Sequence, residues 1–229
     1  MSYLNTAAKK AAREDAVPLD EADGSATAEG ETIHQIGFLG VPEPTAEGEC
    51  IFEADVADVG YVMNVSRLWA YQPATMTGLF NLLRQANSAG SLSLRQRSIL
   101  VAACASAIGD SYCSLVWGSK MATASDGLTA AGVLRGSDRG LSSSERAMAG
   151  WARKVARDPN ATNAADMQAL RDAGFTDPQI FTITVFVALR LAFSTVNDAL
   201  GVRPDAALRS TTPAVVLDAV TFGRPIEEA

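Results

Sequence analysis

The chain has 229 residues, 48% hydrophobic and 20% charged, a composition typical of a globular protein with a buried core. The formal net charge is −7 with no cluster of Lys and Arg, which argues against a nucleic-acid partner because phosphate binding needs such clusters. No apolar run reaches the ~18 residues of a membrane span, and no apolar segment follows the first lysines as in a secretory signal. One histidine and three scattered cysteines build neither a zinc site nor a disulfide framework, so we expect no metal, no cofactor and a cytoplasmic protein.

Residues 1–57 are expected to form an acidic, partly mobile arm ahead of a helical domain at 58–229. Residues 1–60 contain 13 of the 26 acidic residues and only 3 of the 19 basic ones. The first 30 residues are rich in Ala, Gly, Asp and Glu, a composition typical of a segment without its own core. The arm is interpreted as a solvated tail or a strap across a neighbouring subunit, with a specific acidic docking element as the alternative.

The sequence of the domain predicts helices from its first residues onward. Asp58 is placed to cap a helix over the following apolar positions, and Pro73 suits the first turn of the next helix. Ser93 is expected to cap an alanine-rich helix that ends at Gly109, and Asp110 to cap the helix after it. Small side chains in the alanine-rich helix predict close approach of its neighbours.

The second half of the domain continues the pattern. Ser142 and Glu145 have the spacing of a capping box, and a short helix over 162–174 closes at Gly174. The longest helix is expected over 178–201 and is apolar nearly all the way round, so a subunit interface is the expected source of part of its cover. Alternating β-branched runs are absent from the sequence. The fold class predicted is all-α.

Cys113 is the one residue whose position favours chemistry. It lies about one turn into the helix that begins near Asp110, where free N–H groups and the helix dipole favour a thiolate, while the Asp110 carboxylate opposes it. The structural alternative is that Cys113 is a small buried hydrophobe, and Cys104 is interpreted in that way. Without a histidine in the body, Ser-His-Asp chemistry is excluded, and no phosphate-binding or dinucleotide motif is present.

Two stretches, residues 60–122 and 141–202, resemble the alkylhydroperoxidase D (AhpD)-like, peroxidase-related branch of the carboxymuconolactone decarboxylase family. The second stretch is the more diagnostic, with its capping box, a DP turn, ALRDAGF and the closing NDALGV. The resemblance spans roughly residues 58–205. It implies an AhpD-like all-α bundle that assembles as a homo-oligomer, a trimer or a hexamer.

Catalytic members of that family use a Glu and, twelve residues later, Cys-x-x-Cys followed after three residues by a His. The resemblance places Ser98 at the Glu position, Asp110 at the first Cys, Cys113 at the second Cys and Trp117 at the His. The family's attacking sulfur is therefore kept, and its base, resolving thiol and imidazole are replaced. Tyr112 keeps an aromatic residue that often precedes the second Cys.

Each replaced residue has a structural interpretation. Asp110 is interpreted as an N-cap, with a general acid or base role if apolar neighbours raise its pKa. Ser98 is expected to fill space, Trp117 to pack in place of the imidazole, and Tyr112 to reflect ancestry rather than mechanism.

Three functions remain open from the sequence. The first is an antioxidant thiol peroxidase that reduces hydroperoxides through Cys113, with an external thiol or Cys104 resolving the oxidised sulfur. The second is a binding or assembly protein that has lost the chemistry. The third is a non-redox lyase that acts on an organic acid with Asp110 as the acid–base group, although Arg95 and Arg97, the nearest arginines in the sequence, are expected to face solvent.

Overall fold

The computed structural model describes residues 36–228, and within that range every regular element is helical. The predicted all-α fold class is confirmed. The first 35 residues of the expected N-terminal arm lie outside the described residues. The helices are α1 (Ala46–Val59), α2 (Asn64–Trp69), α3 (Pro73–Gly90), α4 (Leu94–Ile108), α5 (Ser111–Ala124), α6 (Gly127–Leu134), α7 (Ser143–Arg157), α8 (Ala164–Asp172), α9 (Asp177–Ala199), α10 (Leu208–Thr211) and α11 (Ala214–Leu217).

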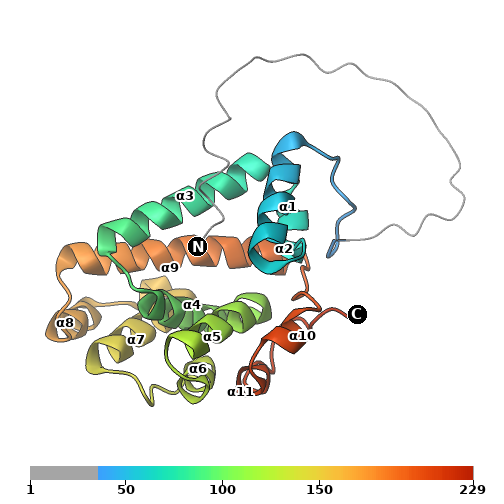
Figure 1. Cartoon of the computed structure of the whole chain (residues 1–229). Helices are drawn as coiled ribbons and strands as arrows, with labels where there is room; N and C mark the ends of the chain where they lie inside the picture. Colours follow the sequence, from blue (N-terminus) through green and yellow to red (C-terminus); the bar gives the residue numbers. More distant parts are fainter. Residues whose placement is uncertain (1–35, 229) are drawn as a thin grey trace, which may run out of the picture.

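The helices form two main layers (Figure 1). The long helices α3 and α9 pack side by side, α4 and α7 pack on α9, and α5 and α6 pack on α4. Within the second layer α4 packs on both α5 and α7. The two short helices α10 and α11 follow α9, and α11 packs on α5 and α6, so the end of the chain lies beside α5.

Most of the expected helix ends are confirmed. The Ser93 side chain accepts a hydrogen bond from the Gln96 N–H, and the Ser142 side chain accepts one from the Glu145 N–H, each within a complete capping box. Gly109 ends α4 in the left-handed conformation at φ 82°, which glycine adopts without strain. These contacts are local, so the sequence is sufficient to predict them.

The expected cap at Asp58 is wrong. Asp58 lies in the last turn of α1, a helix that starts after the Thr45 cap and ends at Gly60 with φ 88°. The apolar positions that follow belong to the separate short helix α2, whose first residue is Asn64. Most of α1 therefore lies inside the segment 1–57 that was expected to be an arm, and this helix packs on α2 and α3.

Helix α4 lies at the centre of the core. All seven residues from 99 to 105 are buried, and their small side chains let α5 and α7 approach closely, as expected. Helix α9 is the one described helix long and apolar enough to cross a membrane by length and composition. Its inner face carries buried polar side chains as well as apolar ones, the pattern of a core helix: Ile183, Phe186, Val187, Arg190, Phe193, Ser194 and Asn197.

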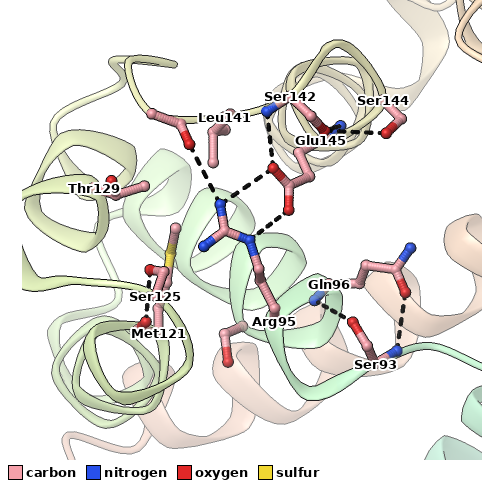
Figure 2. Close-up of polar contacts among 12 residues, drawn as sticks. Ser93, Arg95, Gln96, Met121, Ser125, Thr129, Leu141, Ser142, Ser144 and Glu145 are labelled. Carbon is pink, nitrogen blue, oxygen red and sulfur yellow. Dashed lines mark hydrogen bonds and ion pairs between the residues drawn. The ribbon is translucent and has the colours of Figure 1, made fainter.

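Arg95 and Arg97 do not face solvent freely, contrary to the expectation. Both are half-buried, and the Arg95 Nε donates to Glu145 Oε1 at 2.5 Å across the α4–α7 contact (Figure 2). The same carboxylate accepts from the Ser142 N–H at 2.8 Å, so the ion pair and the capping box of α7 share one group. The hydrogen bond from Arg95 is the largest of the effects that lower the pKa of Glu145.

Candidate functional site

Cys113 lies in the first turn of α5 and is buried, with 2% of its surface exposed. The predicted cap holds: Asp110 Oδ1 accepts a hydrogen bond from the Cys113 N–H at 2.9 Å. This contact fixes the carboxyl of Asp110 beside the residue that carries the thiol. Asp110 is itself completely buried.

Helix α9 supplies two polar groups to the sulfur that the sequence analysis missed. Arg190 Nη2 donates to Cys113 Sγ at 3.4 Å, and the Ser194 hydroxyl donates to the same atom at 3.7 Å. The two residues are four positions apart and so share one face of the helix. Arg190 is 5% exposed. It is the only charged residue between Asp177 and Asp198, a signal that the sequence did offer.

The pKa of the Cys113 thiol is raised well above its ordinary value, first by burial and then by the charge of Asp110. Arg190 and the hydrogen bond from Ser194 act in the opposite direction. These opposing effects leave the pKa of the resting thiol raised, although the helix N-terminus was expected to favour the thiolate. Desolvation is the largest effect because the sulfur has almost no contact with solvent.

A second carboxyl lies near the first. The pKa of Asp198, one turn beyond Ser194 on α9, is raised to about 7 by burial and by Asp110, while Arg224 opposes the shift. Asp110 Oδ2 is buried and has no hydrogen-bond partner among the described residues. An unpartnered buried carboxyl oxygen is able to accept a proton from a neighbouring group.

Trp117 does more than fill the space expected of it. The ring is half-buried, and two cations lie over it, with Arg190 Cζ at 5.1 Å and Lys120 Nζ at 4.7 Å from its centre. The guanidinium of Arg190 also lies 5.2 Å from the centre of the Phe193 ring. Trp117 and Phe193 thus hold Arg190 against Cys113 by cation–π contacts.

The polar atoms of Ser98 and Tyr112 bond away from the sulfur. The Ser98 hydroxyl donates to the Leu94 carbonyl at 2.8 Å within its own helix. The Tyr112 hydroxyl donates to Asp205 in the segment after α9, where Asp205 also accepts from the Asn64 N–H. Of the sequence-predicted residues, the structure therefore brings Asp110 and Trp117 to the Cys113 environment, and gives Tyr112 an anchoring contact.

The other cysteines are free thiols. Cys104 is buried, donates to the Val101 carbonyl at 3.4 Å and has a pKa raised to about 12 by burial. Cys50 is exposed on α1. Residues 36–228 contain no group of three His, Cys, Asp or Glu side chains suited to a metal ion, and His34 lies outside the described residues.

The end of the chain covers the N-terminus of α5. The Ser111 hydroxyl donates to the Arg224 carbonyl at 2.7 Å. A side chain at Gly223 would meet the Gly109 carbonyl at 2.4 Å, so the two backbones are in direct contact. A cavity of about 300 Å³ lies between this segment and the first turns of α5, lined by Ser111, Leu115 and residues from 217 to 226.

No family model and no curated protein matches the chain. Solved structures do. An uncharacterized peroxidase-related protein from Silicibacter sp. TM1040 superposes with a TM-score of 0.67 at 22% identity, covering 78% of this chain and 96% of the other. The alkylhydroperoxidase AhpD core of an uncharacterized peroxidase-related protein from Ralstonia eutropha JMP134 superposes with a TM-score of 0.62 at 22% identity, covering 76% of this chain and 95% of the other. The chain has an AhpD-like fold.

The AhpD-like fold confirms the architecture that the sequence resemblance implied. A third structure with this fold, the debrominase Bmp8 in complex with 2,3,4-tribromopyrrole, has a TM-score of 0.62 at 16% identity over 79% of this chain and 96% of that one. Because structures named as peroxidase-related and as a debrominase share the AhpD-like fold, the fold alone does not fix the reaction. The reaction has to be argued from the residues around Cys113.

Proposed function

We propose that the chain is a single-cysteine thiol peroxidase that reduces hydroperoxides through Cys113. One observation carries the proposal: a buried sulfur contacts the guanidinium of Arg190 and lies beside the carboxyl of Asp110. A cation next to a thiol stabilises the thiolate, which is the attacking species. An adjacent carboxyl supplies the proton acceptor, so Arg190 and Asp110 take over the roles that the replaced family residues leave open.

The reaction proceeds in two stages. The Cys113 proton passes to Asp110 Oδ2, and the thiolate, paired with Arg190, attacks one peroxide oxygen. The S–O bond forms as the O–O bond breaks, and the departing alkoxide takes the proton from Asp110 to leave as an alcohol. Cys113 is then a sulfenic acid. One external thiol converts it to a mixed disulfide and releases water, and a second thiol releases the disulfide and restores Cys113.

The raised pKa of the resting thiol is compatible with this order of events. A thiol that stays protonated until a base accepts its proton needs general-base help, a contribution of about 10²–10⁴ in rate. The sulfur is only 2% exposed, so peroxide reaches Cys113 only after a local movement of the residues that cover it. Such a local opening requires less free energy than unfolding of the whole domain.

The test is peroxide consumption with a dithiol as the electron donor. Wild type is expected to turn over, Cys113→Ser to be inactive, and Asp110→Asn to lose about 10²–10⁴ in rate. Cys50→Ser and Cys104→Ser are the matched controls, and a drop in Cys104→Ser alone would identify Cys104 as the resolving thiol. Equal rates of peroxide loss in wild type and Cys113→Ser would overturn the proposal. If both rates equal the rate without protein, a binding or assembly protein is favoured.

A lyase acting on an organic acid is the second candidate. Asp110 is buried with one free carboxyl oxygen, and Arg190 is a buried cation close by that an anionic substrate needs. This candidate requires no sulfur chemistry. Loss of an organic acid that survives Cys113→Ala and disappears in Asp110→Asn would support it over the peroxidase.

We also propose that the protein works in the cytoplasm as a homo-oligomer, a trimer or a hexamer. The outward face of α9 supports the assembly, since Phe181 is 72% exposed and begins an uncharged stripe along that helix. An exposed aromatic side chain on an uncharged helix face is typical of an interface. The stripe consists of Phe181, Val185, Ala188, Ala192, Thr195 and Ala199.

A further inference from the structure

Arg190 is a buried cation without an acidic partner. None of the four ion pairs among the described residues includes it, and Cys113 Sγ is the one hydrogen-bond acceptor that residues 36–228 offer to its guanidinium. Its Nε is buried and makes no hydrogen bond there. Burying a charge is costly unless it is paired and hydrogen-bonded, so this arrangement points to a missing anion.

The surroundings of Arg190 carry further positive charge. Lys120 is an exposed residue, and its Nζ lies over the same tryptophan ring that Arg190 contacts. The pKa of Lys120 is lowered by desolvation first and by the charges of Arg190 and Arg97, while Asp58 acts the other way. The Asp110 carboxyl raises the pKa of Cys113 but forms no ion pair with Arg190. The two cations over the Trp117 ring, Arg190 and Lys120, therefore have no acidic partner there among the described residues.

We propose that Arg190, Lys120 and Trp117 form a subsite for a carboxylate carried on an apolar or aromatic body. The guanidinium is the donor that matches a carboxylate, and its free Nε remains available when Nη2 contacts Cys113. The half-buried Trp117 ring offers apolar surface to the body of the ligand. A phosphate dianion is a poorer fit because it is more strongly hydrated and finds only two cations here.

This inference rests on the proposed function and adds to it the class of substrate. A hydroperoxide with a carboxylate bound at Arg190 would have its reacting oxygen near Cys113, because the guanidinium and Sγ are 3.4 Å apart. Trp117 is half-buried and Lys120 exposed, so the ligand approaches from their side. The peroxide group would thus react at Cys113 while the carboxylate binds at Arg190, so binding and reaction can be measured separately.

The first experiment measures binding by titration calorimetry in the Cys113→Ser protein, which has no peroxidase chemistry. The probes are benzoate, benzyl alcohol and inorganic phosphate. Benzoate is expected to bind, the other two to bind at least tenfold more weakly, and Arg190→Gln to weaken benzoate at least tenfold. Arg139→Gln removes an exposed charge of the same kind and is the matched control.

Three outcomes would overturn the inference. They are equal benzoate affinity in Arg190→Gln and Arg139→Gln, benzyl alcohol binding as tightly as benzoate, and phosphate binding more tightly than benzoate. Arg190→Gln is expected to fold, because it removes an unpaired buried charge, and circular dichroism and a melting curve are the measurements that check this. If it fails to fold, Lys120→Gln gives the same reading at an exposed residue, with at least threefold weaker benzoate binding expected.

The second experiment separates recognition from catalysis. A short hydroperoxide whose carboxylate lies only a few bonds from the O–O group and its methyl ester differ only in the carboxylate, so the ratio of their kcat/KM values reports recognition. The ratio is expected to exceed 10 in wild type and to fall near 1 in Lys120→Gln and Arg190→Gln, and a wild-type ratio near 1 would contradict the inference. Benzoate binding without any peroxide turnover would remove the proposed function and leave the subsite standing.

Discussion

At the scale of single residues, the site is a balance of opposite charges around one sulfur. Burial and Asp110 keep Cys113 protonated, and Arg190 and Ser194 favour the thiolate. The resting protein therefore protects the thiol, and a change in either neighbour shifts the balance. This arrangement explains how a cysteine that is almost completely buried is still placed for chemistry.

The raised pKa of Asp198 makes the stability of the protein depend on pH. Its pKa is about 7 in the folded chain and ~3.9 in an unfolded one, so the folded chain keeps a proton that the unfolded chain loses between these values. The free energy of unfolding then falls as pH rises from about 4 to about 7, and the contribution of Asp198 is complete below about 4.

We expect Asp198→Asn to reduce that fall in stability. The measurement is denaturant unfolding from pH 4 to pH 7, with Asp218→Asn, at an exposed carboxyl, as the control. Identical pH slopes for wild type, Asp198→Asn and Asp218→Asn would show that Asp198 ionises normally, and Asp110 would then not influence it.

At the scale of elements, the contacts that end helices could be predicted from the sequence and the contacts between helices could not. Ser93, Asp110 and Ser142 bond to N–H groups three residues ahead, so the spacing alone reveals them. Arg190 meets Cys113 across 77 positions in the sequence, and no local pattern says which helix faces which. The isolated position of Arg190 in an apolar helix indicates that this residue has a special role, but it does not indicate that its partner is Cys113.

The Tyr112 contact shows how α5 is held in place. Its hydroxyl bonds to the buried carboxyl of Asp205, and the pKa of Asp205 is raised by burial although this hydrogen bond lowers it. Tyr112→Phe leaves one carboxyl oxygen without its donor and is expected to lower the free energy of unfolding by about 1–3 kcal/mol.

Urea unfolding measures this loss, and Tyr71→Phe provides the control. The Tyr71 side chain is exposed and donates to the Gly40 carbonyl at 3.1 Å, so its loss should cost under about 0.5 kcal/mol. If the two variants are equally stable, Tyr112 does not anchor α5.

At the scale of the whole molecule, α9 faces two ways. Its inner side completes the core and the site, and its outer stripe from Phe181 to Ala199 carries no charge. The sequence already indicated that this helix was too apolar to be covered by one domain. The AhpD-like fold accounts for the inner face, and the proposed homo-oligomer accounts for the outer one.

We expect Phe181→Glu to weaken or abolish the assembly, because a charge would enter an apolar interface. Light scattering after size-exclusion chromatography gives the mass of the wild-type and variant particles. Leu128→Glu is the control, since Leu128 is also highly exposed but lies on α6, away from the stripe. A wild-type protein that is monomeric at all concentrations would contradict the proposed assembly.

Trapping the oxidised sulfur tests directly whether Cys113 reacts with hydroperoxide. The full-length protein is treated with one equivalent of hydroperoxide in the presence of dimedone, which reacts with sulfenic acids, and the modified residue is located by peptide mass spectrometry. We expect an adduct on Cys113 in wild type and at least tenfold less of it in Asp110→Asn. An adduct confined to the exposed Cys50, with Cys113 unmodified, would contradict this expectation.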